Sequence, residues 1–174
     1  MAQIGWIFHR DRCTACRGCI NACKFENNTT QDLAVNYRWL ELRESGTYPN
    51  PAVEFFTLAC NHCQQPACLA ACPVNAITKR AQDGIVLIDQ DKCIGCQYCN
   101  WACPYGVPVY NEVTQKVEKC TFCVHRIDQG MRPACADTCV GRAIEFGYNV
   151  VAPGDPPGGF ADVSLTRPQI EFRK

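Results

Sequence analysis

Residues 93–104 have the pattern C-x2-C-x2-C-x3-C-P. This is the spacing of bacterial iron–sulfur proteins that hold two clusters. Three close thiolates bind three corners of one cubane cluster, while the fourth cysteine lies one helical turn further on and reaches a neighbouring cluster. One such run therefore predicts a second run elsewhere in the sequence.

The chain contains four such runs, and together they use all sixteen of its cysteines. Run one has the same spacing, run two is wider in the middle, and run four has eleven residues inserted before its third cysteine. In sequence order the runs are Cys13, Cys16, Cys19 and Cys23; Cys60, Cys63, Cys68 and Cys72; Cys93, Cys96, Cys99 and Cys103; and Cys120, Cys123, Cys135 and Cys139.

Three chemistries compete for these cysteines. An even number permits disulfides, but disulfide scaffolds are usually short and secreted, and residues 1–6 show no export signal. Zinc sites usually consist of separated C-x2-C pairs, which the triple spacing fits poorly. Four repeated runs are instead typical of [4Fe–4S] clusters.

The exchange of the fourth cysteine predicts four ligand sets. Runs two and three are adjacent and should pair, which leaves runs one and four to pair across the sequence. The predicted sets are Cys60, Cys63, Cys68 and Cys103; Cys93, Cys96, Cys99 and Cys72; Cys13, Cys16, Cys19 and Cys139; and Cys120, Cys123, Cys135 and Cys23.

The fold class expected from this pairing is α+β, with two interleaved bacterial ferredoxin-like modules that each hold two clusters. Residues 1–26 and 110–151 form the outer module and residues 60–109 the inner one. Short helices are expected over residues 18–24, 66–72, 97–103 and 133–139, with Pro66 and Pro133 in first turns. Residues 76–80 and 84–88 flank an Asp-Gly turn and predict a hairpin.

Two stretches lie outside the runs. Residues 27–59 predict a β-rich insertion, with strands near 35–40 and 53–56 and an exposed loop between them, and residues 152–174 predict an extended tail after a Pro/Gly-rich linker. Neither stretch supplies a ligand, so we expect part of the surface formed by their large apolar side chains to dock a protein partner. The candidates are Tyr37, Trp39, Phe55, Phe56, Ile170 and Phe172.

Charge and motifs exclude several function classes. Lys plus Arg and Asp plus Glu both number 17, and four oxidised clusters with their thiolates would bring the net charge to about −8. The sequence has no basic stripe for nucleic acid, no phosphate-binding glycine loop, no nucleophile–base constellation and no apolar run of membrane-spanning length. We therefore expect a non-catalytic protein.

The order of the runs and several local motifs resemble the four-cluster electron-transfer subunits of the dimethyl sulfoxide reductase family of molybdenum enzymes. The motifs lie at residues 60–63, 95–99, 103–106, 143–147 and 167–168, and the resemblance covers nearly the whole sequence. Some relatives replace one ligand by Trp and hold a three-iron cluster, whereas all sixteen cysteines here imply four [4Fe–4S] clusters. Val140 follows Cys139 where the family has proline.

The resemblance implies a subunit that passes single electrons between a large molybdopterin or tungstopterin catalytic subunit and a second redox partner. That partner would be a quinone-linked subunit, a flavoprotein or a ferredoxin. The alternatives are the polyferredoxin of a tungsten aldehyde oxidoreductase and, in another class, a zinc-binding interaction module. The expected location is the cytoplasm, or the periplasm if the protein is exported with a signal-bearing partner.

Several other side chains lie near the ligands. His62 and His125 are expected to shape their loops rather than bind metal, and Tyr98 and Trp101 to shield a cluster from water. Four cations adjoin ligands, and the sequence leaves open whether they tune the clusters or are solvated: Lys24, Lys92, Lys119 and Arg142.

Overall fold

The computed structural model describes residues 2–29, 31, 34–150 and 153–174 of the chain. Short helices are mixed with small, mainly antiparallel sheets, which confirms the α+β class. Within these described ranges the longest helix has nine residues, and no helix combines the length and apolar character that a bilayer crossing needs.

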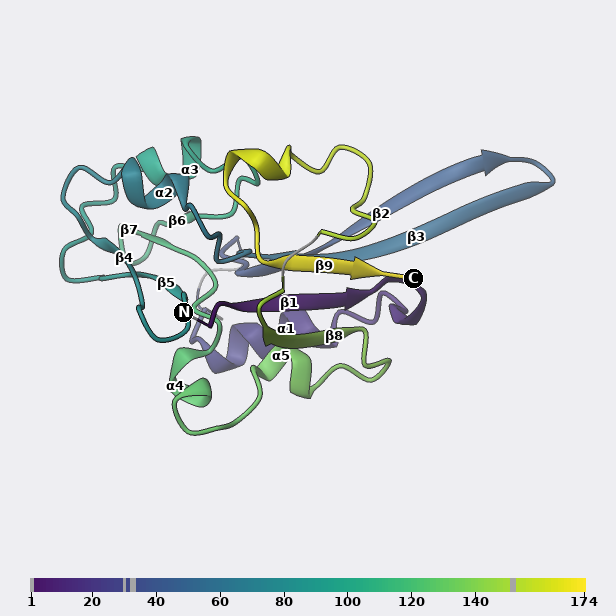
Figure 1. The fold of residues 1–174 in the computed structure, drawn as a ribbon, viewed down its shortest axis with the longest axis horizontal. Helices are drawn as coiled ribbons and strands as arrows, with labels where there is room; N and C mark the ends of the chain where they lie inside the picture. Colours follow the sequence, from purple (N-terminus) through teal and green to yellow (C-terminus); the bar gives the residue numbers. More distant parts are fainter. Residues whose placement is uncertain (1, 30, 32–33, 151–152) are drawn as a thin grey trace.

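A three-stranded sheet joins the two ends of the molecule's sequence (Figure 1). Its middle strand, β1 (Ile4–His9), pairs antiparallel with β8 (Ile144–Tyr148) and parallel with β9 (Ile170–Arg173). A Cβ atom on Gly5 would lie only 2.7 Å from the carbonyl oxygen of Gln169, so glycine is required for the close approach of the C-terminal segment.

Aromatic side chains fill the core beside this sheet. Phe172 of β9 packs edge-on against Phe8 and Phe56, with ring centroids 6.2 and 6.4 Å apart. Trp6 stacks on Phe122 at 4.0 Å. Such rings bury large apolar areas, so the aromatic core supplies stability that does not depend on metal.

Four of the six side chains expected to dock a partner are buried within the molecule and are not available to one, contrary to the sequence-based expectation. Because β9 completes the central sheet, Ile170 and Phe172 are buried within the molecule, and Tyr37 and Phe56 are buried beside the sheet. Trp39 and Phe55 are half-buried. The predicted linker begins at Ala152, which lies outside the described residues.

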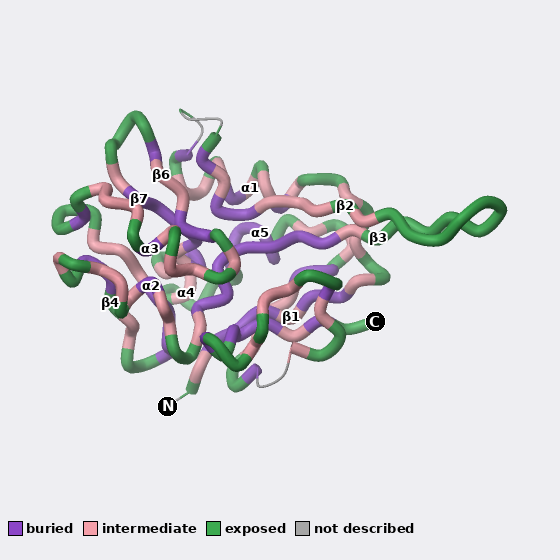
Figure 2. Tube along the Cα trace, turned by 90° about the horizontal axis from the view of Figure 1, so that it is seen from above, coloured by how far each residue is buried: buried purple, intermediate pink, exposed green. Residues whose placement is uncertain are grey.

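The insertion forms a long β hairpin, here called the arm. Its strands are β2 (Arg38–Thr47) and β3 (Asn50–Ala59), joined by the two residues Tyr48 and Pro49. The predicted strand pair is present, but most of the predicted loop is also strand, because pairing continues to Thr47 and Asn50. Figure 2 shows the base of the arm buried and its outer half exposed beyond the body of the molecule.

The helices that carry cysteines pack in two pairs: α1 lies against α5, and α2 against α3. Apart from α1 each is a single turn, shorter than predicted, and α4 was not predicted. The sequence placed Pro66 and Pro133 in the first turns of α2 and α5. In the structure each precedes its helix as the N-cap residue. The bounds are α1 Gly18–Glu26, α2 Ala67–Ala70, α3 Tyr98–Trp101, α4 Val124–Ile127 and α5 Ala134–Asp137.

Two small hairpins lie at the end of the molecule opposite the arm (Figure 1). The pairing of β4 (Ile77–Lys79) with β5 (Val86–Ile88) confirms the hairpin predicted from the Asp-Gly turn. The hairpin of β6 (Val109–Asn111) and β7 (Lys116–Glu118) was not predicted. Two single-turn 3₁₀ helices, η1 (Arg10–Arg12) and η2 (Val163–Leu165), complete the fold.

Candidate iron–sulfur centres

The cysteine loops share an unusual backbone. The residue before the second cysteine has a positive φ in every run: Ala15, His62, Gly95 and Phe122, with φ values of 56°, 43°, 71° and 57°. In a turn that contains a left-handed residue, successive backbone N–H groups point toward one concave side, which suits an anionic group. Phe122 donates its N–H to the Cys120 sulfur at 3.4 Å, as this geometry requires.

Runs two and four also end alike. The backbone N–H of Ala76 donates to the Cys72 sulfur at 3.2 Å, and Ala143 donates to the Cys139 sulfur at the same distance. In both places Ala-Ile then leads into a strand, β4 or β8, so runs two and four end in the same local structure. N–H donors stabilise thiolate over thiol, and ligand sulfur must be thiolate.

Two groups of four cysteines each line a cavity. Cys60, Cys63, Cys68 and Cys103 surround one, with apolar walls from Pro66, Val86 and Val107. Cys72, Cys93, Cys96 and Cys99 surround the other, with Ile77, Ile88 and Val117. We call these groups set C and set D. Each combines cysteines of runs two and three, because α2 and α3 pack together. Two residues after each helix ends, a cysteine (Cys72 or Cys103) lines the cavity of the other run.

Runs one and four meet in the same way. Set A denotes Cys13, Cys16, Cys19 and Cys139, and set B denotes Cys23, Cys120, Cys123 and Cys135. Burial raises the pKa of Cys13, and the thiolates of Cys19, Cys139 and Cys16 raise it further. Burial, with the neighbouring thiolates of Cys135 and Cys123, raises the pKa of Cys23 to about 12. The packing of α1 on α5 brings these cysteines together.

The four sets lie in a row. Burial is the main cause of the raised pKa of Cys19 in set A, and the nearby Cys135 thiolate of set B raises that pKa further. Cys120 of set B is likewise affected by Cys60 of set C. Sets C and D share α2 and α3. The order A–B–C–D follows, with set A near the base of the arm and set D at the opposite end.

The donor sets fit iron–sulfur clusters chemically. All sixteen cysteines are free, and burial raises the pKa of most of them, for example Cys68 to about 12 and Cys99 to about 11. Cluster assembly displaces the thiol protons and supplies iron as the compensating charge. Four soft thiolates around an apolar cavity are the donor set that iron–sulfur clusters use.

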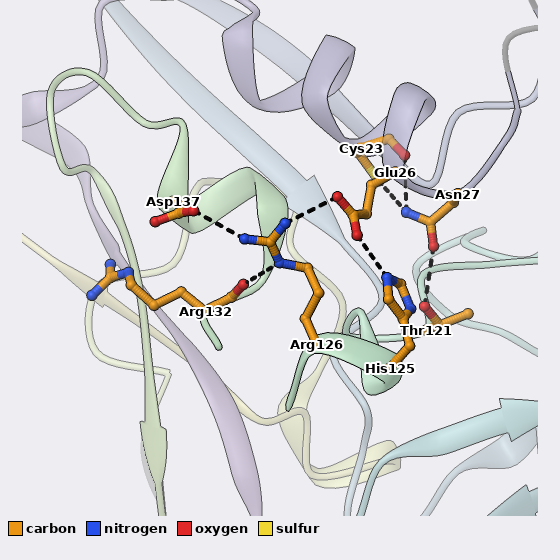
Figure 3. A network of polar contacts seen from close by, with 8 residues as sticks. All are labelled: Cys23, Glu26, Asn27, Thr121, His125, Arg126, Arg132 and Asp137. Carbon is orange, nitrogen blue, oxygen red and sulfur yellow. Dashed lines mark hydrogen bonds and ion pairs between the residues drawn. The ribbon is translucent and has the colours of Figure 1, made fainter. Parts of the chain in front are cut away.

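A polar network ties the end of α1 to run four beside set B (Figure 3). The Glu26 carboxylate accepts from His125 Nε2 at 2.7 Å and from Arg126 at 3.0 Å. Asn27 accepts from the Thr121 hydroxyl at 3.2 Å and donates to the Cys23 carbonyl at 2.9 Å. The network holds together segments about a hundred residues apart in sequence, so Cys23 stays beside run four.

The two histidines inside the cysteine runs, His62 and His125, have different environments. His125 takes part in the network above, and His62 is fully buried with Nδ1 accepting the Val86 N–H at 3.0 Å. Burial, with nearby Lys119 and Lys79, holds the pKa of His62 well below its usual value, so the ring is neutral. Its Nε2 atom has no partner, and His62 lines the cavity of set C.

Tyr98 and Trp101, which the sequence suggested would shield a cluster from water, are themselves exposed. Their ring centroids lie 5.6 Å apart with the ring planes tilted by 36°, and the two residues are 50% and 73% exposed. The α3 helix has one turn, and because Cys99 points inward these neighbours point outward. Ile94, which lines the cavity of set D, is 60% exposed, so this end of the molecule carries three exposed apolar side chains.

The four cations predicted near ligands have different environments. Lys92 pairs with Asp89 at 3.0 Å on the surface, Arg142 is exposed, and Lys24 donates to the Val35 carbonyl at 2.8 Å. Only Lys119 is buried. A second buried cation, Arg38, was missed because it is fifteen residues from the nearest cysteine in sequence, and no local pattern marks it.

Comparisons with known proteins agree with this chemistry. Residues 51–149 match a family model described as a 4Fe-4S dicluster domain. The sequence is 39% identical over 155 residues to the B component of anaerobic dimethyl sulfoxide reductase from Escherichia coli (strain K12), covering 83% of this protein and 73% of the relative.

Two further relatives match over shorter lengths. The beta component of perchlorate reductase from Dechloromonas aromatica (strain RCB) is 51% identical over 110 residues, which is 63% of this protein and 33% of the relative. The B component of tetrathionate reductase from Salmonella typhimurium is 42% identical over 133 residues, with 76% and 52% covered.

Proposed function

This protein belongs to the iron–sulfur subunits of the dimethyl sulfoxide reductase family of molybdenum oxidoreductases, and from this membership we propose that sets A, B, C and D form a single electron path through the molecule. The protein is an electron-transfer subunit that carries four [4Fe–4S] clusters, and catalysis takes place in the molybdenum subunit. The relatives do not favour the polyferredoxin of a tungsten aldehyde oxidoreductase or a zinc module.

We propose that each set holds one cluster with the ligands predicted from the sequence. The cavities lined by sets C and D and the mutual effects of the thiolates within sets A and B support this assignment. The modules would interleave, with residues 60–109 between the two parts of the outer module, 1–26 and 110–151. The insertion (27–59) and the tail (152–174) would add the arm and β9.

When bound, each cluster supplies a site that accepts and releases one electron. The protein's own residues provide the setting: apolar walls exclude water, N–H groups such as that of Ala143 donate to ligand sulfur, and buried cations offset negative charge. The observation that carries the proposal is the row of sets. Sets C and D are carried by two helices that pack together, and the thiolates of sets A and B and of sets B and C are close enough to influence one another, so an electron that enters at one end has a route through the row.

We propose that the two ends of the row serve different partners. Cys16 is the one exposed cysteine of the sixteen, so set A is the end most open to the molybdenum subunit. At the opposite end, the exposed apolar side chains of Ile94, Tyr98 and Trp101 beside set D are suited to a second redox partner.

Metal analysis and one ligand variant test the assignment. Anaerobically purified protein should contain about 16 iron and 16 sulfide per molecule, and stoichiometric zinc without sulfide would contradict the proposal. Replacing Cys23 by Ser should perturb the cluster of Cys120, Cys123 and Cys135. If electron paramagnetic resonance shows instead that the cluster of Cys13, Cys16 and Cys19 changes, the interleaved pairing is wrong.

A further inference from the structure

Arg38, at the start of β2, is a buried cation without an acidic partner. The residue is 3% exposed, and no ion pair joins it to a carboxylate anywhere in the part of the chain that the structure describes. Its guanidinium donates to the carbonyl and hydroxyl oxygens of Thr57, each at 3.4 Å, and lies 4.7 Å from the centre of the Trp6 ring. The Nη2 atom has no partner.

An arrangement of this kind is costly unless a negative group lies close by. Taking a guanidinium out of water without a counter-charge is strongly unfavourable, whereas a nearby anion can offset the cost. The neutral contacts of Arg38 do not provide that charge. The missing counter-charge must therefore come from groups around the residue that become negative in the mature protein.

Four cysteines from two sets lie close enough to Arg38 to influence its pKa. The Thr57 hydroxyl that it contacts also lies 3.5 Å from the Cys19 sulfur, which links the guanidinium to set A. Burial lowers the pKa of Arg38, but the thiolates around it outweigh burial and raise the pKa overall. In order of effect they are Cys135, Cys19, Cys120 and Cys23. Cys19 belongs to set A and the other three to set B, so Arg38 lies at the junction of the two sets.

Lys119, a second buried cation, lies beside sets B and C and provides a comparison with Arg38. Lys119 is 3% exposed and donates to the carbonyl oxygens of Val86 and Cys120. It lines the cavity of set C, and it lowers the pKa of Cys68 against the larger effect of burial. Lys119 thus adjoins sets B and C, whereas Arg38 adjoins sets A and B.

We propose that Arg38 is the fixed counter-charge shared by the clusters of sets A and B and that it raises the midpoint potentials of both. This inference rests on the ligand sets proposed above. Each reduction adds one electron, supplied by a redox partner, and the guanidinium keeps its proton throughout. Because reduction makes the cluster more negative, a cation held beside it stabilises the reduced state. Arg38 contacts no substrate. It acts only through the positive charge that it holds beside the two clusters.

The test uses redox titrations of the purified complex followed by electron paramagnetic resonance. Signals are first assigned with one Cys→Ser variant per set. In R38Q we expect the reduced-to-oxidised ratio of clusters A and B at a fixed potential to fall at least tenfold, which is 59 mV for one electron. Cluster D should not change. R38K, which keeps the charge, should retain most of the wild-type potentials of A and B.

K119M serves as the contrast, since it should lower the potential of cluster C and leave that of cluster A unchanged. An R38Q complex with all four clusters and unchanged A and B potentials would overturn the proposal. If R38Q does not assemble, the test rests on R38K, which keeps the positive charge. A clear fall in the potentials of clusters A and B in R38K would show that the shape of the Arg38 side chain, and not its charge, sets them, and would contradict the proposal. Failure of the ligand sets would appear separately, in the wild-type iron content and in the C23S spectrum.

Discussion

Glu26 is the residue through which the end of α1 holds run four (Figure 3). The hydrogen bond from His125, followed by the charge and hydrogen bond of Arg126, lowers the pKa of Glu26 despite partial desolvation. A lowered folded-state pKa means that the carboxylate contributes stability above its unfolded pKa of about 4.3 and that the contribution is lost as pH falls through the folded value.

We therefore predict that E26Q lowers the free energy of unfolding by about 1 kcal/mol at pH 7, since it removes a charged acceptor that is partly open to water. The difference between wild type and E26Q should shrink as pH falls below about 4.3. Anaerobic unfolding midpoints of both proteins, measured across this range, test the sign. A difference that stays constant, or grows at low pH, would show that the ion pair is not the cause.

Gly95 and Ala15 occupy the same place in runs three and one, and both have positive φ. Ala15 shows that the loop tolerates a side chain at this backbone angle. At Gly95, however, an added Cβ would lie 2.5 Å from the Gln115 carbonyl oxygen of the β6–β7 turn. The clash, more than the dihedral angle, therefore requires glycine.

We predict that G95A destabilises set D by about 1–3 kcal/mol, with loss or distortion of its cluster signal. The matched variant A15G should leave cluster A intact, because it removes a methyl group from a position that accepts one. Iron content and electron paramagnetic resonance of the two variants give the comparison. Equal effects in both loops would contradict the role of Gln115.

At the scale of elements, the arm has two different faces. Cross-strand partners share a face, so Leu42 with Phe55 and Glu44 with Val53 lie on one side of the hairpin. Leu42 is 55% and Val53 49% exposed. Further along this face Thr57 contacts the Cys19 sulfur of set A. An isolated two-stranded ribbon is marginally stable in water, so an apolar face of this length favours contact with a partner.

We predict that the double variant L42S/V53S binds the molybdenum subunit at least tenfold more weakly while keeping all four clusters. S45N, on the opposite face of the arm, is the control and should bind normally. Binding can be measured by co-purification and by titration of the isolated subunits, with iron content as the measure of folding. If the double variant binds like the wild type, the arm is not part of that interface.

Which elements could be predicted from sequence depended on how local their determinants are. The cysteine spacing and the β4–β5 turn are encoded within a few residues, so the runs and that hairpin were recognised. β9 has only four residues, and its partner β1 lies at the other end of the sequence, so the tail looked like a docking segment. Arg38 approaches set B only through folding, since it is fifteen residues past Cys23.

At the scale of the whole molecule, the core has two parts that differ in their dependence on metal. The part around the central sheet contains aromatic rings, including Trp6, Phe8 and Phe172. The smaller part, around sets C and D, consists of three ligand cysteines and four aliphatic side chains, with no aromatic ring among these buried residues: Cys68, Ala76, Ile77, Val86, Cys93, Cys99 and Val117. Metal-binding free energy becomes folding free energy where no other core is available.

We predict that removing iron unfolds the set D end first. After anaerobic chelation, amides of β4, β5 and β7 should lose protection from hydrogen exchange, because their core is lined by ligand thiols that no longer hold a cluster. Amides of β1 and β8 should retain partial protection, since the stacked Trp6 and Phe122 rings remain. Hydrogen–deuterium exchange of the loaded and chelated protein, resolved by peptide, makes the comparison. If β4 and β5 stay as protected as β1, their small apolar core is sufficient without metal and the division of the molecule into metal-dependent and metal-independent parts is wrong.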